Sequence, residues 1–176
     1  MTKALFLDRD GIINVDHGYV SNIEDFEFIE GIFDLIKLFS NEGYLIFIVT
    51  NQSGIGRGYY TEEDFNILTQ WMCEHFEQAG ISIEKVSYCP HAPEAHCHCR
   101  KPETGMIDEI LKTYNIDLSH SWMIGDKQSD IDLAKSANIG HSIAITSKKM
   151  QNTDYIFPSI SECKRFLEEN TDIIYG

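Results

Sequence analysis

The chain has 176 residues, 43% of them hydrophobic and 24% charged, which is the size and composition of one globular domain over residues 1–176. Its 14 Lys and Arg against 28 Asp and Glu give a formal net charge of -14, so we expect no nucleic-acid partner. The longest apolar run, residues 45–49, is far shorter than the roughly 20 residues that cross a bilayer. No membrane association is therefore expected, and we predict a cytoplasmic protein.

Short apolar runs alternate with helical patterns along the chain. The runs are expected to form buried strands at residues 3–7, 44–49, 85–88, 122–124 and 142–145. Apolar residues at one-face spacing predict helices over residues 32–42, 62–79, 106–114, 130–137 and from 162 onward. The expected N-caps of the second, fourth and fifth helices are Thr61, Ser129 and Ser161.

This order of elements predicts an α/β fold, with a Rossmann-like three-layer arrangement around a mainly parallel sheet. Ligands of such sheets bind outside the carboxyl ends of the strands. The irregular stretches 11–28, 52–60 and 89–104 each follow an expected strand. All three should therefore meet at the same edge of the sheet.

The first polar cluster follows the first strand, where Asp8 and Asp10 stand two residues apart before Gly11. One carboxylate there can attack phosphorus while its neighbour moves a proton, if a divalent metal screens their repulsion. The second strand ends in Thr50 and continues into residues 51–54, with a hydroxyl, two amides and backbone donors suited to a phosphate. Taken alone, each cluster is more typical of an ordinary turn.

Two further clusters follow later strands: the cations of residues 100–101 and the acidic pair Asp126 and Asp130. A nucleophile pair, a hydroxyl, a lysine and an acidic pair, in that order and each at a strand end, resemble the four motifs of the haloacid dehalogenase phosphohydrolase superfamily. The resemblance implies a phosphatase, which is a phosphoric monoester hydrolase. Only about 40 residues separate Asp10 from Thr50, so we expect no separate cap domain.

The resemblance also implies catalytic and metal-binding roles. Asp8 would form an aspartyl-phosphate, and Asp10 would protonate the leaving alkoxide and then activate water. Mg2+ would be held by the carboxylates of Asp8 and Asp126 and by the backbone carbonyl of Asp10. Thr50 and Lys101 would hold the phosphoryl oxygens. These roles agree with the preference of Mg2+ for oxygen ligands and with the need of phosphoryl transfer for positioned positive charge.

Two residues beside the acidic motif have less direct roles. The resemblance implies that Asp130 orients Lys101 or a metal-bound water. Lys127 would face either the substrate or the solvent, and the sequence leaves both open.

Two loops resemble more specifically those of the bacterial heptose-bisphosphate phosphatases, and this likeness covers residues 3–146. They are residues 14–20, after the nucleophile, and residues 51–58, after Thr50. The substrate contacts that the likeness implies are Asp16, His17, Gly18, Tyr19, Asn51, Gln52, Ser53 and Arg100. The implied reaction is removal of the C7 phosphate from a small sugar bisphosphate, D-glycero-D-manno-heptose 1,7-bisphosphate. It would serve ADP- or GDP-heptose precursor synthesis, and through it lipopolysaccharide.

Three of the five cysteines lie close together. Residues 89–91 read Cys-Pro-His and residues 97–99 read Cys-His-Cys, a set that is typical of closed tetrahedral Zn2+ sites, with His96 and His98 as competing ligands. The predicted ligands of Zn2+ are Cys89, His91, Cys97 and Cys99. Four protein ligands leave no open position for water, so zinc would be structural, ordering the loop 89–99 and directing residues 100–101 toward the phosphate.

Alternatives remain open at this stage. The interval between His91 and Cys97 is short, as in the related histidinol-phosphatases, which share the zinc signature, and other small sugar phosphates are further candidate substrates. A non-catalytic phosphosugar-binding module of the same fold would typically lack Asp8 or Asp10, and both are present. We expect the protein to be a monomer.

Overall fold

The computed structural model describes residues 1–175 and contains one six-stranded sheet in which all neighbouring strands are parallel. The strand order is β3-β2-β1-β4-β5-β6, with the first strand of the chain near the centre. The strands are β1 (Ala4–Leu7), β2 (Leu45–Asn51), β3 (Ile83–Cys89), β4 (Trp122–Gly125), β5 (His141–Ile145) and β6 (Tyr155–Phe157). The predicted α/β fold with a parallel sheet is thereby confirmed.

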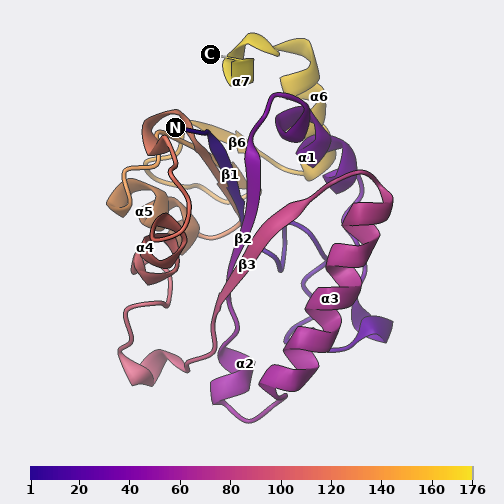
Figure 1. The fold of residues 1–176 in the computed structure, drawn as a ribbon, viewed down its shortest axis with the longest axis vertical. Coiled ribbons are helices and arrows are strands. Elements are labelled where there is room, and N and C mark those ends of the chain that lie inside the picture. The colour runs from indigo at the N-terminus through magenta and orange to yellow at the C-terminus, as the bar shows by residue number, and fades with distance from the viewer. Residues whose placement is uncertain (176) are drawn as a thin grey trace.

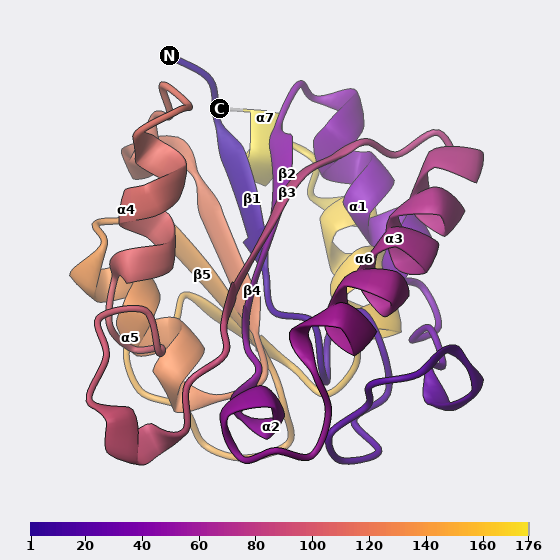
Figure 2. The same cartoon turned by 60° about the horizontal axis from the view of Figure 1, so that its bottom comes forward.

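Helices cover both faces of the sheet and produce three layers (Figures 1 and 2). One face packs against α1 (Ile32–Asn41), α3 (Glu62–Gln78) and α6 (Ile160–Glu169), and the other against α4 (Gly105–Leu111) and α5 (Gln128–Ser136). The short elements are α2 (Ser53–Gly56), α7 (Asp172–Tyr175) and the 3-10 turns η1 (Ile23–Asp25), η2 (Pro93–Ala95) and η3 (Leu118–His120). No helix within residues 1–175 is long and apolar enough to cross a membrane.

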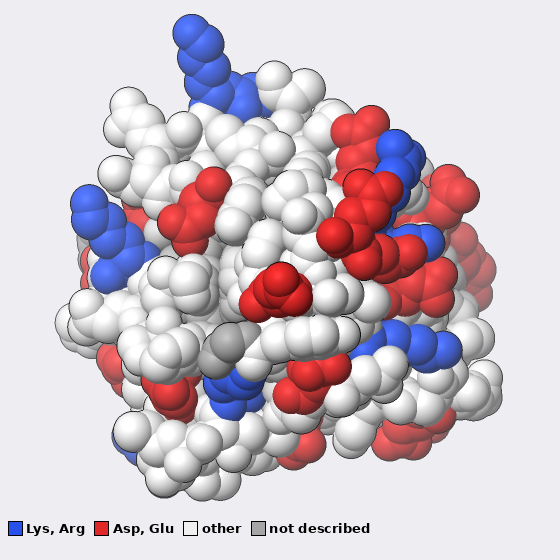
Figure 3. All heavy atoms as spheres, turned by 90° about the horizontal axis from the view of Figure 1, so that it is seen from above, with Lys and Arg blue, Asp and Glu red and all other residues white. Residues whose placement is uncertain are grey.

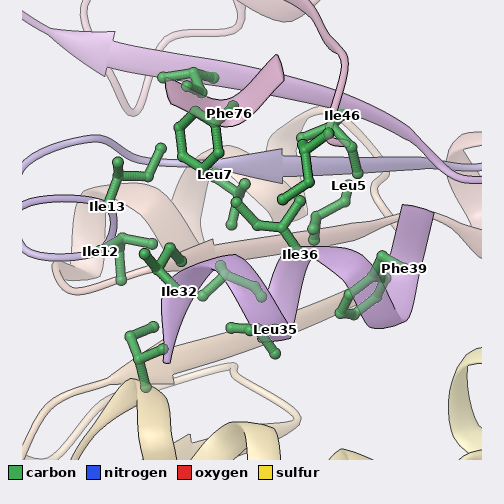
Figure 4. Packing of buried hydrophobic residues seen from close by; sticks show 14 of the residues in the cluster. Leu5, Leu7, Ile12, Ile13, Ile32, Leu35, Ile36, Phe39, Ile46 and Phe76 are labelled. Carbon is green, nitrogen blue, oxygen red and sulfur yellow. The ribbon is translucent and has the colours of Figure 1, made fainter. Parts of the chain in front are cut away.

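Strand β1 is buried on both faces. Leu5 and Leu7 pack with α1 and its neighbours in one core (Figure 4), whereas Ala4 and Phe6 belong to the core on the opposite face. Because successive side chains of a strand alternate, a strand covered on both sides must be apolar at every position. Each fully buried Leu or Phe contributes roughly 2 kcal/mol through removal of apolar surface from water. The residue that follows this strand, Asp8, therefore extends from a rigid support.

The sequence patterns did not predict three elements of the structure: β6, α2 and α7. Each has only three or four residues, too few for an apolar period to repeat. The third predicted helix also ends early, at Leu111, and residues 112–113 form a turn instead.

Two predicted helix starts were wrong by two residues. Ser159, not Ser161, caps α6: its Oγ accepts a backbone N–H at 3.2 Å, whereas Ser161 donates to a backbone carbonyl before α1 at 3.3 Å. Lys127, not Ser129, is the N-cap residue of α5. The carboxylate of Asp130 accepts the backbone N–H of Lys127 at 3.1 Å, which is the return bond of a capping box, while the Lys127 side chain makes no cap hydrogen bond.

The loops that follow the strands gather at one edge of the sheet, at the bottom of Figure 1 near α2. Within residues 1–175 the chain between β1 and β2 holds only a loop, η1 and α1, and no separate cap domain. Figure 3 shows the opposite end of the molecule, where basic side chains lie apart or beside acidic ones and form no continuous patch. The site must therefore be sought at the loop-bearing edge.

Candidate active site

Lys101 joins three of the strand ends at this edge. Its Nζ donates to Asp8 Oδ1 at 2.9 Å, to Asp130 Oδ1 at 2.7 Å and to the carbonyl of Val49 at 2.9 Å. All three side chains are almost completely buried, with 3%, 8% and 1% of the Lys101, Asp8 and Asp130 side chains exposed. The structure thus brings the nucleophile candidate, the lysine and the acidic motif into direct contact.

Negative charge exceeds positive charge in this buried cluster. Burial, and next the repulsion of Asp130, raise the pKa of Asp8 well above its ordinary value. Burial and the same neighbour also raise the pKa of Asp126. Burial by itself would lower the pKa of Lys101, but the Asp130 and Asp8 carboxylates outweigh it and raise that pKa. One lysine does not balance three carboxylates, so the cluster lacks a cation.

The oxygen atoms of this cluster fit a hard divalent cation. Carboxylate oxygens of Asp8, Asp126 and Asp130 lie within 4.8 Å of one another, and Oδ1 of Asp126 is buried without a hydrogen-bond partner among residues 1–175. Gly11 has a φ of 89°, and a Cβ at this position would collide with the Asp126 carboxylate. Oxygen ligands of this kind suit Mg2+.

Asp130 is the least available of the three carboxylates. Its Oδ1 accepts from Lys101, and its Oδ2 accepts the backbone N–H groups of Asp126 at 3.2 Å and Lys127 at 3.1 Å. Asp8 and Asp126 are therefore the carboxylates with oxygens to spare, whereas the Asp130 oxygens are taken up by Lys101 and by the start of α5.

A second network surrounds Asp10. Its Oδ1 accepts from Arg9 Nη2 at 2.8 Å and from Asn14 Nδ2 at 3.0 Å, and its Oδ2 accepts from Gln52 Nε2 at 3.1 Å. The same Gln52 nitrogen donates to Thr50 Oγ1 at 2.9 Å. Thr50 on β2 is thus linked through a single side chain to Asp10, which lies in the loop after β1.

Most of the predicted substrate-binding residues line a cavity of about 420 Å³ beside this network. The predicted residues that line it are Asp10, Asp16, Gly18, Tyr19, Asn51, Gln52, Ser53, Arg100 and Lys101. His17 is not among the lining residues; its Nε2 lies 3.0 Å from Glu27 Oε2 on the exposed side of the loop. The neighbours of His17 in this loop, Asp16 and Gly18, do line the cavity, and Asp16 Oδ1 accepts the N–H of Gly18 at 3.0 Å.

Four lining residues were not predicted as site residues: Arg57, Tyr60, Lys127 and Ser129. Arg57 carried a signal, because it is the only cation in the glycine-rich stretch after Thr50. The sequence left Lys127 open between substrate and solvent, and the structure places it at the cavity. Tyr60 carried no sequence signal, since an aromatic residue before a helix is ordinarily part of the core.

The cysteine cluster forms a second metal-binding constellation next to this cavity. Cys89 Sγ lies 3.5 Å from Cys97 Sγ and 2.7 Å from Cys99 Sγ, and Cys99 Sγ lies 3.2 Å from His91 Nδ1. Two thiolates bound to one tetrahedral zinc ion are roughly 3.8 Å apart. The donor set fits Zn2+, and Cys97 Sγ lies near this spacing, 3.5 Å from Cys89 Sγ and 3.6 Å from Cys99 Sγ, whereas the Cys89 and Cys99 sulfurs are closer together than a shared zinc ion would hold them. His96 and His98 do not belong to the cluster, whose donors lie within 4.8 Å of one another.

The cluster is connected to the active-site loops on both sides. Cys99 directly precedes Arg100 and Lys101. The carbonyl of Pro90 accepts the N–H of Gly56 at 2.8 Å, and a Cβ at Gly56 would collide with this loop. A metal at the cysteines would therefore brace two walls of the cavity.

Comparisons with known proteins agree with this geometry. A family model for HAD-like hydrolases matches residues 98–163. D-glycero-beta-D-manno-heptose-1,7-bisphosphate 7-phosphatase of Helicobacter pylori is 46% identical over 167 residues, which cover 94% of each chain. D-glycero-alpha-D-manno-heptose-1,7-bisphosphate 7-phosphatase of Campylobacter jejuni is 44% identical over 169 residues, covering 96% of this chain and 97% of the relative.

A solved structure supports the fold. D,D-heptose 1,7-bisphosphate phosphatase from B. bronchiseptica, in complex with magnesium and phosphate, superposes with a TM-score of 0.82 at 23% sequence identity. The match covers 96% of this chain and 99% of that chain.

Proposed function

The chain belongs to the heptose-1,7-bisphosphate 7-phosphatase family of haloacid dehalogenase-like hydrolases, and from this premise we propose that it removes the C7 phosphate of D-glycero-D-manno-heptose 1,7-bisphosphate. The observation that carries the proposal is the contact of Lys101 with Asp8 and Asp130 beside a polar cavity of about 420 Å³. A binding module has no need of a buried carboxylate whose pKa is raised by burial and by a second carboxylate.

Asp8 is the nucleophile of the first step. Both hydrogen bonds to its carboxylate, from Lys101 Nζ at 2.9 Å and from its neighbour Arg9 N–H at 2.8 Å, are made to Oδ1, which leaves Oδ2 to attack. The bond from phosphorus to Asp8 Oδ2 forms and the bond from phosphorus to the C7 oxygen breaks. Asp10 gives its proton to that leaving oxygen.

The second step regenerates the enzyme. Asp10, now a carboxylate, takes a proton from water as the water oxygen attacks phosphorus. The bond from phosphorus to Asp8 breaks, and inorganic phosphate is formed. Thr50 and Lys101 donate to the phosphoryl oxygens in both steps, which is the positioned positive charge and hydrogen bonding that phosphoryl transfer requires. All three N–H donors of Lys101 are in use, on Asp8, Asp130 and the carbonyl of Val49, so the hydrogen bond to Asp8 Oδ1 is the one that passes to the phosphoryl group.

Mg2+ would be held by the carboxylates of Asp8 and Asp126 and by the backbone carbonyl of Asp10. When bound, it supplies the positive charge that the carboxylate cluster lacks and neutralises the transferring phosphoryl group. Zn2+ would be held by the three thiolates and the imidazole of the cysteine cluster, with a structural role.

The cavity offers groups for the rest of the substrate. Nη1 of Arg100 is buried without a hydrogen-bond partner among residues 1–175, and Arg57, Lys127 and Ser129 line the same cavity. An unpaired buried guanidinium N–H is costly unless a ligand oxygen satisfies it. We infer that Arg100 binds the remote phosphate or sugar hydroxyls and that this binding positions the C7 phosphate for attack.

Phosphorus NMR of the reaction products tests the proposal. The enzyme with Mg2+ should release the C7 phosphate and leave the C1 phosphate on the sugar, with a higher kcat/KM for a heptose bisphosphate anomer than for histidinol phosphate or fructose 1,6-bisphosphate. Release of the C1 phosphate first, or preference for histidinol phosphate, would contradict it.

A further inference from the structure

We propose that Tyr60 and Gln52 act as a positioning pair that fixes which oxygen of Asp10 delivers the proton to the leaving group. Neither residue is needed to bind the sugar in this role, although both line the cavity. The inference rests on the proposed function, because it takes Asp10 as the proton donor. It reassigns Gln52, which the sequence placed among the substrate contacts.

The first step of the argument counts the lone pairs of Asp10. A carboxyl group offers about four lone-pair sites for hydrogen bonds. Oδ1 has both of its sites taken, by Arg9 Nη2 at 2.8 Å and by Asn14 Nδ2 at 3.0 Å. Oδ2 has one site taken, by Gln52 Nε2 at 3.1 Å. One site on Oδ2 is left, and the transferable proton must be carried there.

The donors on Oδ1 cannot easily turn away. Arg9 is 1% exposed, its Nη2 also donates to the carbonyl of Val20 at 2.7 Å, and its guanidinium lies 5.9 Å from the ring centre of Phe26. Asn14 is fully buried and its Nδ2 also donates to the carbonyl of Val15 at 3.1 Å. The occupation of Oδ1 is therefore built into the fold.

The donor on Oδ2 is different, because a glutamine amide can rotate by half a turn. Rotation would turn Gln52 Oε1 toward Asp10, where it would accept the proton and hold it away from the substrate. The hydroxyl of Tyr60 donates to Gln52 Oε1 and disfavours this rotation, because after half a turn the hydroxyl would face the Gln52 NH2 group and its proton would lose this acceptor. Gln52 is 2% exposed and Tyr60 is 8% exposed, so water offers little competition for this bond.

Two further observations support a donating Tyr60 in this place. Burial raises the pKa of Tyr60 to about 12, so that the hydroxyl keeps its proton at neutral pH. Gly54 leaves room for the ring, since a Cβ there would collide with Tyr60 Cε1. The glycine of this loop thus allows the tyrosine to reach the glutamine.

The same amide orientation sets the direction of the Thr50 hydroxyl. Gln52 Nε2 donates to Thr50 Oγ1 at 2.9 Å, and the Thr50 hydroxyl itself makes only a long hydrogen bond, of 3.5 Å, to the carbonyl of Asn51. Its hydrogen can therefore turn to a phosphoryl oxygen with little loss. The pair therefore controls two hydrogen atoms of the first step: the Thr50 hydrogen bonded to the phosphoryl group, and the Asp10 proton that moves to the leaving oxygen as its bond to phosphorus breaks.

A leaving-group series tests the pair with Tyr60→Phe, which removes only the hydroxyl. In a phosphatase that forms a covalent aspartyl-phosphate, kcat/KM reports the steps up to release of the alcohol. An alkoxide leaving group needs a proton in these steps, whereas nitrophenolate is stable enough to leave without one. We expect Tyr60→Phe to lower kcat/KM at least about 10-fold for ethyl phosphate and glycerol 1-phosphate but less than about 3-fold for p-nitrophenyl phosphate. Gln52→Met should reproduce this difference even if Tyr60→Phe folds poorly.

Tyr59→Phe is the matched control, because Tyr59 is 61% exposed and its hydroxyl makes no hydrogen bond within residues 1–175. It should leave both kinds of ester unchanged. Equal losses on alkyl and aryl esters in both Tyr60→Phe and Gln52→Met, or no loss in either, would overturn the inference while leaving the proposed function intact. A wild-type enzyme that hydrolyses no ester, or an Asp8→Asn variant as active as wild type, would instead overturn the proposed function and this inference with it.

Discussion

Replacing Asp126 with asparagine should stabilise the protein without Mg2+ and abolish its stabilisation by Mg2+. The Asp126 carboxylate lies in the cluster with Asp8 and Asp130, and Lys101 contacts the other two members of that cluster. Asparagine keeps the shape of the side chain and removes one negative charge. The variant thus separates two effects of the Asp126 charge: repulsion within the cluster, which lowers stability without Mg2+, and attraction for Mg2+.

The size of the effect follows from the spacing. Oxygens of the cluster lie within 4.8 Å, and two unit charges at that separation repel by roughly 3.5 kcal/mol at an effective dielectric constant of about 20. Relaxation and the nearby lysine reduce the gain, so we expect about 1–3 kcal/mol of added stability. For a protein of this size, each kcal/mol raises Tm by roughly 2–4 °C.

The sign of the pH dependence is also determined. Burial and Asp130 raise the pKa of Asp126 in the folded protein. A raised carboxyl pKa costs stability once the pH exceeds the unfolded value of about 4, because the unfolded chain then releases its proton more readily. The advantage of Asp126→Asn should therefore be full at neutral pH and should vanish as the pH falls toward about 4.

Thermal unfolding in Mg2+-free buffer, without a chelator that would strip zinc, measures the effect. At about 100 times its Kd, Mg2+ should stabilise the wild type by about 2.7 kcal/mol, or roughly 5–11 °C in Tm, and leave Asp126→Asn unchanged. Asp132→Asn is the matched control: it removes the same charge nearby, and the side chain's contact with Gln128 Nε2 at 3.0 Å survives. A variant less stable than wild type without Mg2+, or one still stabilised by Mg2+, would refute the reasoning.

Three shorter predictions concern the other parts of the site. Asp8→Asn should lower phosphate release at least about 1,000-fold with a native-like unfolding curve, because the attacking oxygen is lost; activity above a few per cent would contradict the nucleophile assignment. Cys97→Ser should lower bound zinc, measured by elemental analysis, and lower Tm, whereas zinc-free protein of equal stability would rule out a structural site. Arg100→Ala should lower kcat/KM roughly 10- to 100-fold for the heptose bisphosphate but under about 3-fold for p-nitrophenyl phosphate, and equal losses would show that Arg100 does not read the sugar.

The strand ends were predictable because each combines two independent signals. A strand buried on both faces must be apolar throughout, as β1 is, and a polar residue directly after it marks the carboxyl edge. Asp8, Thr50 and Asp126 were located in this way, and Lys101 by its place in the order of the four motifs. The parallel sheet then brings residues that are far apart in the chain to one edge.

The hydrogen-bond partners within the site were not predictable by the same means. Gln52 was expected to contact substrate, yet its amide bonds Asp10 and Thr50. The partner that holds it, Tyr60, comes from the loop before α3, and no spacing rule relates the two residues. Arg9, for which the sequence predicted no role, is only 1% exposed and lies against the Asp10 carboxylate and the rings of Phe26 and Phe65.

The negative charge of the whole molecule opposes binding of an anionic substrate at the site. The net charge of -14 repels a sugar bisphosphate, although salt at about 0.1 M confines that repulsion to roughly 10 Å. The lysine of the reaction centre, Lys101, is already neutralised by Asp8 and Asp130. The attraction for a second phosphate then comes from the cations along the cavity wall, and the attraction for the reacting phosphate comes from the metal ion. In the proposed mechanism a divalent cation is therefore a condition for productive binding as well as for chemistry.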